Sequence, residues 1–503
     1  MLDYLLKRPM LFCGIFCSVI AVVGYYFGIT LLLFGVIIAI AVCVLIFKNF
    51  NPVLIFSLIL MLLMVLSSIN AFGFAARAEK FVGKTLPCDF VVKESVNKGS
   101  YNKASIEITD SAKMLIGKTA DVVYYNDILE VGKYYSGKIK FREIAEEYKL
   151  MNYSENIFLS GILKDTKPIP EREDHVLQSA EKIRGYIKET LFRHLGYNEA
   201  STLCAILFGD RSFFSNEFYN NVKGAGVSHV MVVSGMHLAV IVSFFTKFLD
   251  FFTYNRHIKA ICIFAVVLFL TLICGFTVSM QRAGITYALF GFSLLLNRRN
   301  TPANSLGAAI VIILLFSPFT IFNVAFQLSV LSTFGILAVA LPIMEYIKTN
   351  EIIKSSVLLF LLNLILLSLS AMLLTLPVTI HVFGYISTVS VLTNLLISNI
   401  VTLTLCVGVT AILASLVSTT LAAVVLMPCD GLLKYINSVI NMFGGWEFSI
   451  LPLASFWSFV IIFLIIFVFW LLLACKKRKD VLKLKKIRKK IIKEGGKIHG
   501  NSF

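Results

Sequence analysis

The chain has 503 residues, of which 58% are hydrophobic and 15% are charged, and its mean hydropathy is +0.84. A soluble domain averages ~25% charged residues, so these values exclude an ordinary water-soluble protein and a disordered one. They predict a polytopic α-helical membrane protein.

The net charge of +17 is unevenly distributed. Residues 77–174 hold 16 basic and 16 acidic residues, whereas residues 475–503 hold 12 basic and 2 acidic residues. With the hydrophobic runs, this pattern predicts four parts: a membrane anchor of three transmembrane helices (1–76), a soluble domain (77–175), a helical membrane body (176–474) and a basic tail (475–503).

Three apolar runs open the chain: Met10–Thr30, Leu31–Phe47 and Pro52–Phe72. The first run is long for a secretory signal and two more follow at once, so we expect an anchor that is not cleaved. Because basic residues favour the cytoplasmic side, Lys7, Arg8 and Lys48 predict that the chain leaves the third crossing on the external face.

The soluble domain contains five short stretches rich in β-branched and aromatic residues. They are Cys88–Ser95, Ala104–Asp110, Ala120–Tyr125, Tyr134–Ile144 and Asn156–Leu163. They predict a small external β-barrel of the oligonucleotide/oligosaccharide-binding (OB) type, although the number of strands alone does not separate this barrel from other small β folds. Cys88 is the single cysteine of the domain, which excludes a disulfide within it.

Beyond the soluble domain the pattern becomes helical. Val176–Leu195 predicts an amphipathic helix on the membrane surface. The basic residues between the later apolar runs predict crossings at Val227–Thr246, Ala260–Thr277, Gly284–Leu296, Pro302–Phe322, Val324–Met344, Val357–Leu376 and Trp457–Ala474. We expect 11 or 12 crossings in all, with the basic tail in the cytoplasm.

Polar residues inside the apolar body are few, and an ionisable one costs at least ~2.5 kcal/mol at the bilayer centre, so they require partners or a function. We predict that they form a channel or polar pathway. The set is Asp210, Arg211, Ser228, His229, Ser234, Gly235, His237, Gln281, Arg282, Gln327, Ser329, Thr375, Pro377, Gly384 and Asn394.

Several members of this set allow two interpretations. Gly209 and Ser212 predict a helix end, where Asp210 and Arg211 are either a charge pair or part of a gate. Gln327 and Asn394 either bond neighbouring helices or line the passage. Leu376–Pro377 with Gly384 predicts a broken helix.

His229 and His237 are eight residues apart, which places both near one face of a helix. They do not complete a metal site. Ser234-Gly235 beside His237 resembles an intramembrane serine protease, but Val232 occupies the place of the first glycine in the G-x-S-G turn, so a kinked helix fits better. We predict no catalytic residue, no metal site and no cofactor.

Five ordered motifs resemble the competence domain of the ComEC family over roughly residues 183–470. They are ILFGDRS, GVSHVMVVSGMHLA, SMQRAG, FQLSVLSTFGIL and TLPVTIHVFGYISTVSVLTNLL. The resemblance implies an inner-membrane channel for uptake of single-stranded DNA in natural transformation. It also marks Gly209, Ala283, Phe326, Leu376 and Phe383. A passage for a strand requires fixed positive charge or donors, for which Arg211 and Arg282 are the best candidates, with His229 and His237 as donors.

The sequence departs from the family's pattern in three places. The H-x-H-x-D-H motif of a metallo-β-lactamase-like domain is absent, the Asn-Pro-Gly start of a family motif is missing at Met151–Leu163, and the soluble domain lacks a second cysteine. The chain is therefore not expected to be an enzyme.

The partners expected are single-stranded DNA, the lipid bilayer, a separate DNA receptor, a cytoplasmic translocase ATPase and a separate nuclease; oligomerisation is left open. The aromatic side chains of the soluble domain either stack on DNA bases or pack in the core of the domain. The zero net charge of the domain provides little electrostatic attraction for DNA. The alternative function is a transporter or lipid-handling protein of the same fold with no role in DNA.

Overall fold

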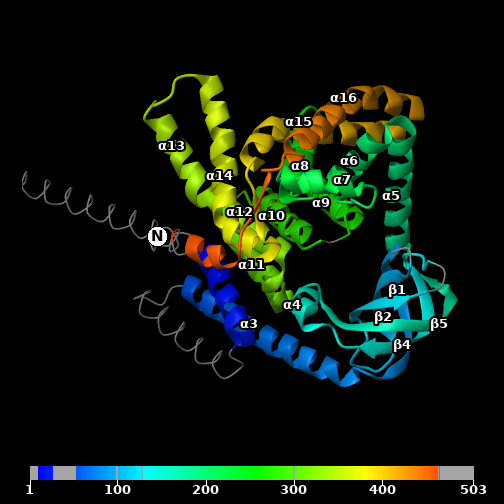
Figure 1. Ribbon diagram of the computed structural model, residues 1–503. Helices are drawn as coiled ribbons and strands as arrows, with labels where there is room; N and C mark the ends of the chain where they lie inside the picture. The colour runs from blue at the N-terminus through cyan, green and yellow to red at the C-terminus, as the bar shows by residue number, and fades with distance from the viewer. Residues whose placement is uncertain are drawn as a thin grey trace, which may run out of the picture.

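The computed structural model describes residues 9–26, 52–97, 100–125, 128–275, 277–297, 301–462 and 464. A β-barrel lies at one end of a body of packed helices, and helix α5 runs between the two (Figure 1). The predicted crossing Leu31–Phe47, most of Trp457–Ala474 and the basic tail lie outside the described residues.

The described elements follow one another in a simple order. Before the barrel come the helix Pro9–Tyr26, α3 (Pro52–Ala78) and η1 (Glu79–Phe81). The barrel comprises β1 (Thr85–Asn97), β2 (Asn102–Asp110), β3 (Thr119–Tyr124), β4 (Lys133–Arg142), α4 (Glu146–Ser154) and β5 (Ile157–Glu173). The body continues with α5 (His175–His194), α6 (Tyr197–Phe208), α7 (Asn216–Gly224), α8 (Gly235–Asp250), α9 (Arg256–Ile273), α10 (Val278–Leu295), α11 (Pro302–Phe316), η2 (Pro318–Phe322), α12 (Val324–Gly335), η3 (Ile336–Ala340), α13 (Leu341–Thr349), α14 (Ser356–Phe383), β6 (Tyr385–Ser387), α15 (Ser390–Ser415), α16 (Thr419–Gly444) and β7 (Ile450–Pro452).

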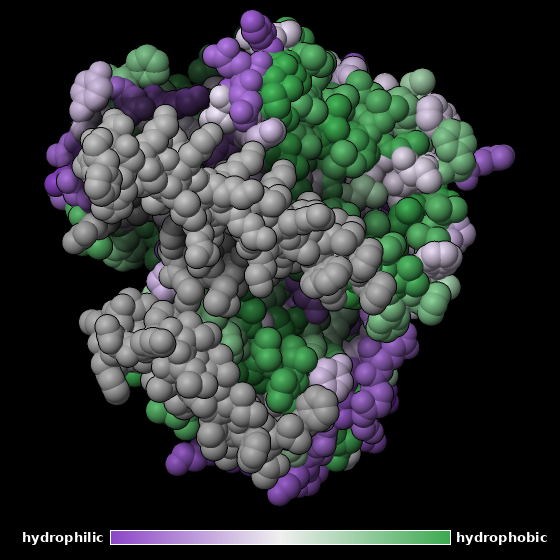
Figure 2. Space-filling view, turned by 90° about the vertical axis from the view of Figure 1, so that its left-hand side faces the viewer, coloured by the Kyte–Doolittle hydropathy of each residue, from purple (hydrophilic) through white to green (hydrophobic). Residues whose placement is uncertain are grey.

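Seven helices among the described residues are long and apolar enough to cross a membrane. They are Pro9–Tyr26, Ile59–Phe81, Arg256–Ile273, Val324–Thr349, Ser356–Phe383, Ser390–Ser415 and Thr419–Gly444. Large apolar side chains of α14 are open to the surroundings, among them Val357, which is 70% exposed. Figure 2, which faces the side of α13 and α14, shows broad hydrophobic areas in the upper part of that surface. Apolar helices with open apolar faces identify a multi-pass membrane protein.

The five strands pair into a closed barrel of order β1-β2-β3-β5-β4. β1 pairs antiparallel with β2 and β4, and β3 pairs parallel with β5. Alternation fills the interior: Ala104, Ile106 and Ile108 of β2 are 1% exposed or less. Each of the five predicted stretches overlaps a strand: β1, β2 and β5 are longer than predicted, β3 is shifted by one residue, and β4 ends at Arg142 instead of Ile144. Helix α4 was not predicted.

Aromatic packing seats the barrel on the helical body. Phe319 of η2 lies with its ring centroid 5.2 Å from that of Tyr153 and 5.8 Å from that of Phe158. Polar bonds reinforce the junction, because Ser317 Oγ donates to Asn156 Oδ1 at 2.9 Å. A 410 Å³ cavity remains between α3, η2 and the barrel.

Two predictions about helix continuity are wrong. The predicted crossing Val227–Thr246 is not one helix, because its first residues form turns and α8 begins only at Gly235. The helix predicted to break at Leu376–Pro377 runs through Pro377, and it ends at Gly384, whose φ of +73° is the left-handed conformation of a helix terminus.

Candidate functional site

The turn segment before α8 is held from two sides. Ser387 Oγ donates to the Gly224 carbonyl at 2.7 Å, and Thr393 Oγ1 donates to the Ala225 carbonyl at 2.6 Å. Gly226 has a φ of +71°, and a Cβ on it would lie 2.4 Å from Ser390 Cβ. β6 and the start of α15 therefore fix the path of residues 224–226, which Ser228 and His229 follow in the chain.

On its other side, this segment packs against α16. A Cβ on Gly224 would lie 2.4 Å from the Gly444 carbonyl oxygen, and one on Gly444 would meet the Asn221 carbonyl oxygen at 2.0 Å. The backbones of α7 and α16 thus touch directly, which only glycine permits. Asn221 Nδ2 also donates to Asn441 Oδ1 at 3.1 Å.

Ser234 and His237 form the N-terminal cap of α8. The Ser234 N–H donates to His237 Nδ1 at 3.1 Å, and Ser234 Oγ accepts from the Met236 N–H at 3.3 Å. This reciprocal arrangement is a capping box, with histidine at the third helical position. Because His237 Nδ1 already accepts a backbone proton, its 3.3 Å approach to Ser234 Oγ does not supply a free base for a nucleophile.

The prediction that His229 and His237 share a helix face is wrong, since His229 lies in the turn segment before the helix. His237 is 1% exposed and its Nε2 has no hydrogen-bond partner in the described part of the chain, whereas His229 is exposed. No group of three potential metal ligands occurs within the described ranges.

Arg282 joins three of the helices. It lies on α10, and its Nε donates to Ser329 Oγ of α12 at 2.7 Å. A Cβ on Gly235, the first residue of α8, would lie 2.7 Å from an Arg282 terminal nitrogen. Five residues therefore come together where α8, α10 and α12 meet. We call them the α8 cluster: Ser234, Gly235, His237, Arg282 and Ser329.

Asp210 and Arg211 lie apart from the α8 cluster. Gly209 ends α6 with a φ of +75°, as its sequence context predicts, and Asp210 pairs with Lys188 of α5 at 2.6 Å. Burial of the carboxyl opposes ionisation, but hydrogen bonds from Lys188 and Ser212 outweigh it and hold the pKa of Asp210 below its ordinary value. Arg211 is not the partner of Asp210, because its guanidinium lies over the Tyr219 ring at 5.9 Å.

The remaining predicted residues are dispersed. Gln327 Nε2 donates to the Ile321 carbonyl at 2.8 Å, and Thr375 Oγ1 donates to the Ala371 carbonyl of its own helix at 3.0 Å. Asn394 has a buried Oδ1 that no described residue contacts by a hydrogen bond. Gln281 is an exposed neighbour of Arg282 on α10, and Pro377 and Gly384 lie within and at the end of α14.

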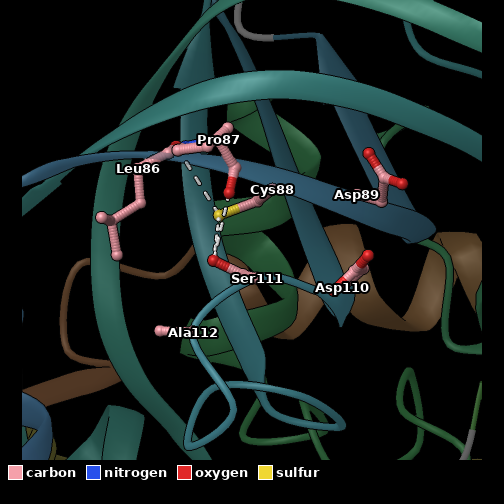
Figure 3. Close-up of a pocket in the computed structure, with 7 residues that line it drawn as sticks. All are labelled: Leu86, Pro87, Cys88, Asp89, Asp110, Ser111 and Ala112. Carbon is pink, nitrogen blue, oxygen red and sulfur yellow. Dashed lines mark hydrogen bonds between the residues drawn. The ribbon is translucent and has the colours of Figure 1, made fainter.

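A 490 Å³ pocket in the barrel is separate from the polar set. Figure 3 shows its lining at the edge of β1 and β2, with Cys88 facing Ser111. Cys88 Sγ lies 3.1 Å from Ser111 Oγ, and burial raises the pKa of the thiol. Asp89 and Asp110 are paired across the two strands. Cys88 is a free thiol, in agreement with the sequence.

Sequence reasoning did not identify Lys188, Gly226 or Thr393 as functional residues. Lys188 lies in a charged helix where nothing local singles it out. Gly226 lies two residues after Gly224, and this spacing was the available signal for a tight turn.

Fold and site together define a multi-pass helical membrane protein that carries a small barrel and keeps a polar cluster among its helices. A family model described as "Competence protein" matches residues 206–478, and the chain belongs to this family. The resemblance to the ComEC family is thereby confirmed.

The chain is also similar to ComE operon protein 3 of Bacillus subtilis (strain 168). The two are 23% identical over 275 residues, which cover 54% of this chain and 34% of that protein. The match therefore spans about a third of the length of this relative. No solved structure matches the chain. The barrel lies outside the family match, whereas the α8 cluster lies inside it.

Proposed function

We propose that this protein takes up DNA in natural transformation, as an inner-membrane channel that conducts a single strand inward. Membership of the competence family supports DNA uptake as its role. The observation that supports a channel is the α8 cluster, in which Arg282 and Ser329 from separate helices meet beside the start of α8.

The chemistry of the cluster suits a strand of DNA. Each nucleotide carries one negative phosphate, so a passage across the membrane body requires cations or oriented donors. Arg282 is 7% exposed in apolar surroundings, a position that is costly unless it has a function.

We further propose that the barrel is an OB-type domain on the external face, with the C-terminal tail in the cytoplasm. The strand order and the parallel pairing of β3 with β5 support the fold assignment. Tyr101 and Tyr125 are 39% and 70% exposed and could stack on bases, whereas Tyr124, Tyr135 and Phe141 are buried in the core.

Other steps of DNA uptake are assigned to separate proteins. The chain contains no H-x-H-x-D-H motif and no phosphate-binding G-x-x-x-x-G-K-[ST] loop. We propose that a separate nuclease, a DNA receptor and a cytoplasmic ATPase act with it.

A gene deletion with complementation tests this function. In a competent host, transformation is expected to be lost on deletion and restored by the wild-type gene at normal protein level. Unchanged transformation together with an envelope defect would instead identify the alternative, a transporter or lipid-handling protein.

A further inference from the structure

Arg282 is a buried cation without a counter-ion among the residues that the structure describes. Its Nε bonds to Ser329, but its two terminal nitrogens have no hydrogen-bond partner among the described residues. No ion pair among the described residues includes Arg282. Other cations do have partners: Lys188 pairs with Asp210, and Lys259 pairs with Asp250. A buried guanidinium left in this state is unfavourable because its charge is desolvated without compensation.

The helix that begins beside Arg282 adds to the positive potential. α8 has 16 residues, and its first turn carries the positive end of the helix dipole. The Ser234 side chain satisfies the backbone N–H groups of Met236 and His237, and Gly235 lets the guanidinium approach the backbone directly.

A second buried donor lies in the same turn. His237 Nε2 is buried and has no hydrogen-bond partner within the described ranges, while His237 Nδ1 accepts the cap hydrogen bond from the Ser234 N–H. The cluster therefore combines nitrogen donors with the N-terminus of a helix. Arg282 is its one charged side chain, and no carboxylate among the described residues pairs with it.

Resting on the proposed function, we infer that the N-terminus of α8 and the Arg282 guanidinium bind one phosphodiester group of the DNA strand. The guanidinium supplies two free nitrogens in a planar fork, which matches two oxygens of a phosphate. A helix N-terminus is an established type of phosphate site. Ser329 orients the guanidinium through Nε and leaves this fork free.

Oligonucleotide binding by the full chain in dodecyl maltoside, a detergent without phosphate, tests this site. Arg282→Met is expected to weaken binding of a fluorescent oligothymidylate by roughly 10- to 100-fold, the loss expected for charge-assisted hydrogen bonds to one phosphate. The slope of log K against log salt is expected to fall by about 0.7, the value for one contact with a single strand. Arg282→Lys should retain the salt slope and lose part of the affinity.

Arg184→Met is the matched control. The Arg184 guanidinium is satisfied by the Ile273 carbonyl at 3.0 Å and by Glu181 at 3.0 Å, so this arginine serves the fold. Its removal is expected to lower the melting temperature and leave the salt slope unchanged. Without any phosphate, Arg282→Met is expected to melt at or above the wild-type temperature, because it removes an unpaired buried charge.

Three results would overturn the site. Wild-type affinity and salt slope in Arg282→Met would show that Arg282 contacts no DNA phosphate. A fall in melting temperature as large as that of Arg184→Met would show that Arg282 serves the fold. If phosphatidylglycerol raises the melting temperature of the wild type but not of Arg282→Met, while oligothymidylate affinity is unchanged by the substitution, the ligand is a lipid headgroup.

These failures differ from failure of the proposed function. Normal transformation in the deletion strain would refute DNA uptake itself, whatever the properties of Arg282. Loss of transformation on deletion, combined with wild-type oligonucleotide binding by Arg282→Met, would refute the phosphate site alone.

Discussion

Replacing Gly226 by alanine is expected to destabilise the segment that carries Ser228 and His229. Gly226 has a φ of +71°, and the left-handed conformation costs a residue with a side chain ~1–2 kcal/mol. The new Cβ would also lie 2.4 Å from Ser390 Cβ, and overpacking of this kind costs ~1–3 kcal/mol. The two effects sum to about 2–5 kcal/mol, a large part of the ~5–15 kcal/mol that stabilises a typical protein.

Gly384→Ala is the matched control for Gly226→Ala. Gly384 has nearly the same φ, +73°, but a Cβ on it has no neighbour within 4 Å, so only the conformational cost of ~1–2 kcal/mol applies. The melting temperatures of the purified chains, with protein levels in the membrane, measure both effects. The double variant Gly226→Ala/Ser390→Gly should recover part of the loss, because it removes the opposing Cβ. Equal losses of stability for Gly226→Ala and Gly384→Ala would refute the close packing of Gly226 against Ser390.

Three further outcomes are expected, each measured as a melting temperature of the full chain. Lys188→Met should lower the melting temperature at neutral pH. Because the pKa of Asp210 lies below its ordinary value of 3.8, the stability that its ionised form contributes is lost as the pH falls through that lowered pKa. The difference in melting temperature between Lys188→Met and the wild type should therefore shrink at that pH. A difference that stays constant with pH would contradict the ion pair. Tyr124→Phe should cost ~1–2 kcal/mol, since the Tyr124 hydroxyl bonds to Ser95 and to the Leu129 N–H, and no loss would show that these bonds are replaced by water. Gly307→Ala should cost ~1–3 kcal/mol, because its Cβ would lie 2.3 Å from the backbone of the helix Pro9–Tyr26, whereas Gly431→Ala, with no neighbour within 4 Å, should be neutral or stabilising.

Local patterns predicted local structure well. Five alternating stretches are the five strands, and the glycine at 209 marks the end of α6 as expected. Both follow from properties of a few neighbouring residues, namely the two-residue period of a strand and the left-handed conformation that glycine permits.

Patterns failed where a distant partner decides the structure. Arg282 and Ser329 are 47 positions apart, and Lys188 and Asp210 lie on different elements, so nothing in a short window links them. Pro377 was expected to break its helix, but α14 continues through it because proline is tolerated where neighbouring helices and side chains compensate.

The histidines show a third kind of failure. An apolar run with helical spacing suggested a helix from Val227, yet the glycines and the cap at Ser234 delay the helix until Gly235. A capping box with histidine at its third position is not one of the usual Ser/Thr…Glu/Gln pairs, so the sequence did not reveal the helix start.

The contact between a DNA strand and the α8 cluster during uptake is the measurement that tests the central claim most directly. A photoreactive residue placed at Gln327, two residues before Ser329 on α12, should cross-link to a strand caught in transit. The same residue placed at Leu369, a 46% exposed position on α14, should not. Cross-links at Gln327 alone are the predicted result. Equal labelling at both positions, or none at Gln327 while uptake proceeds, would contradict a passage along α8, α10 and α12.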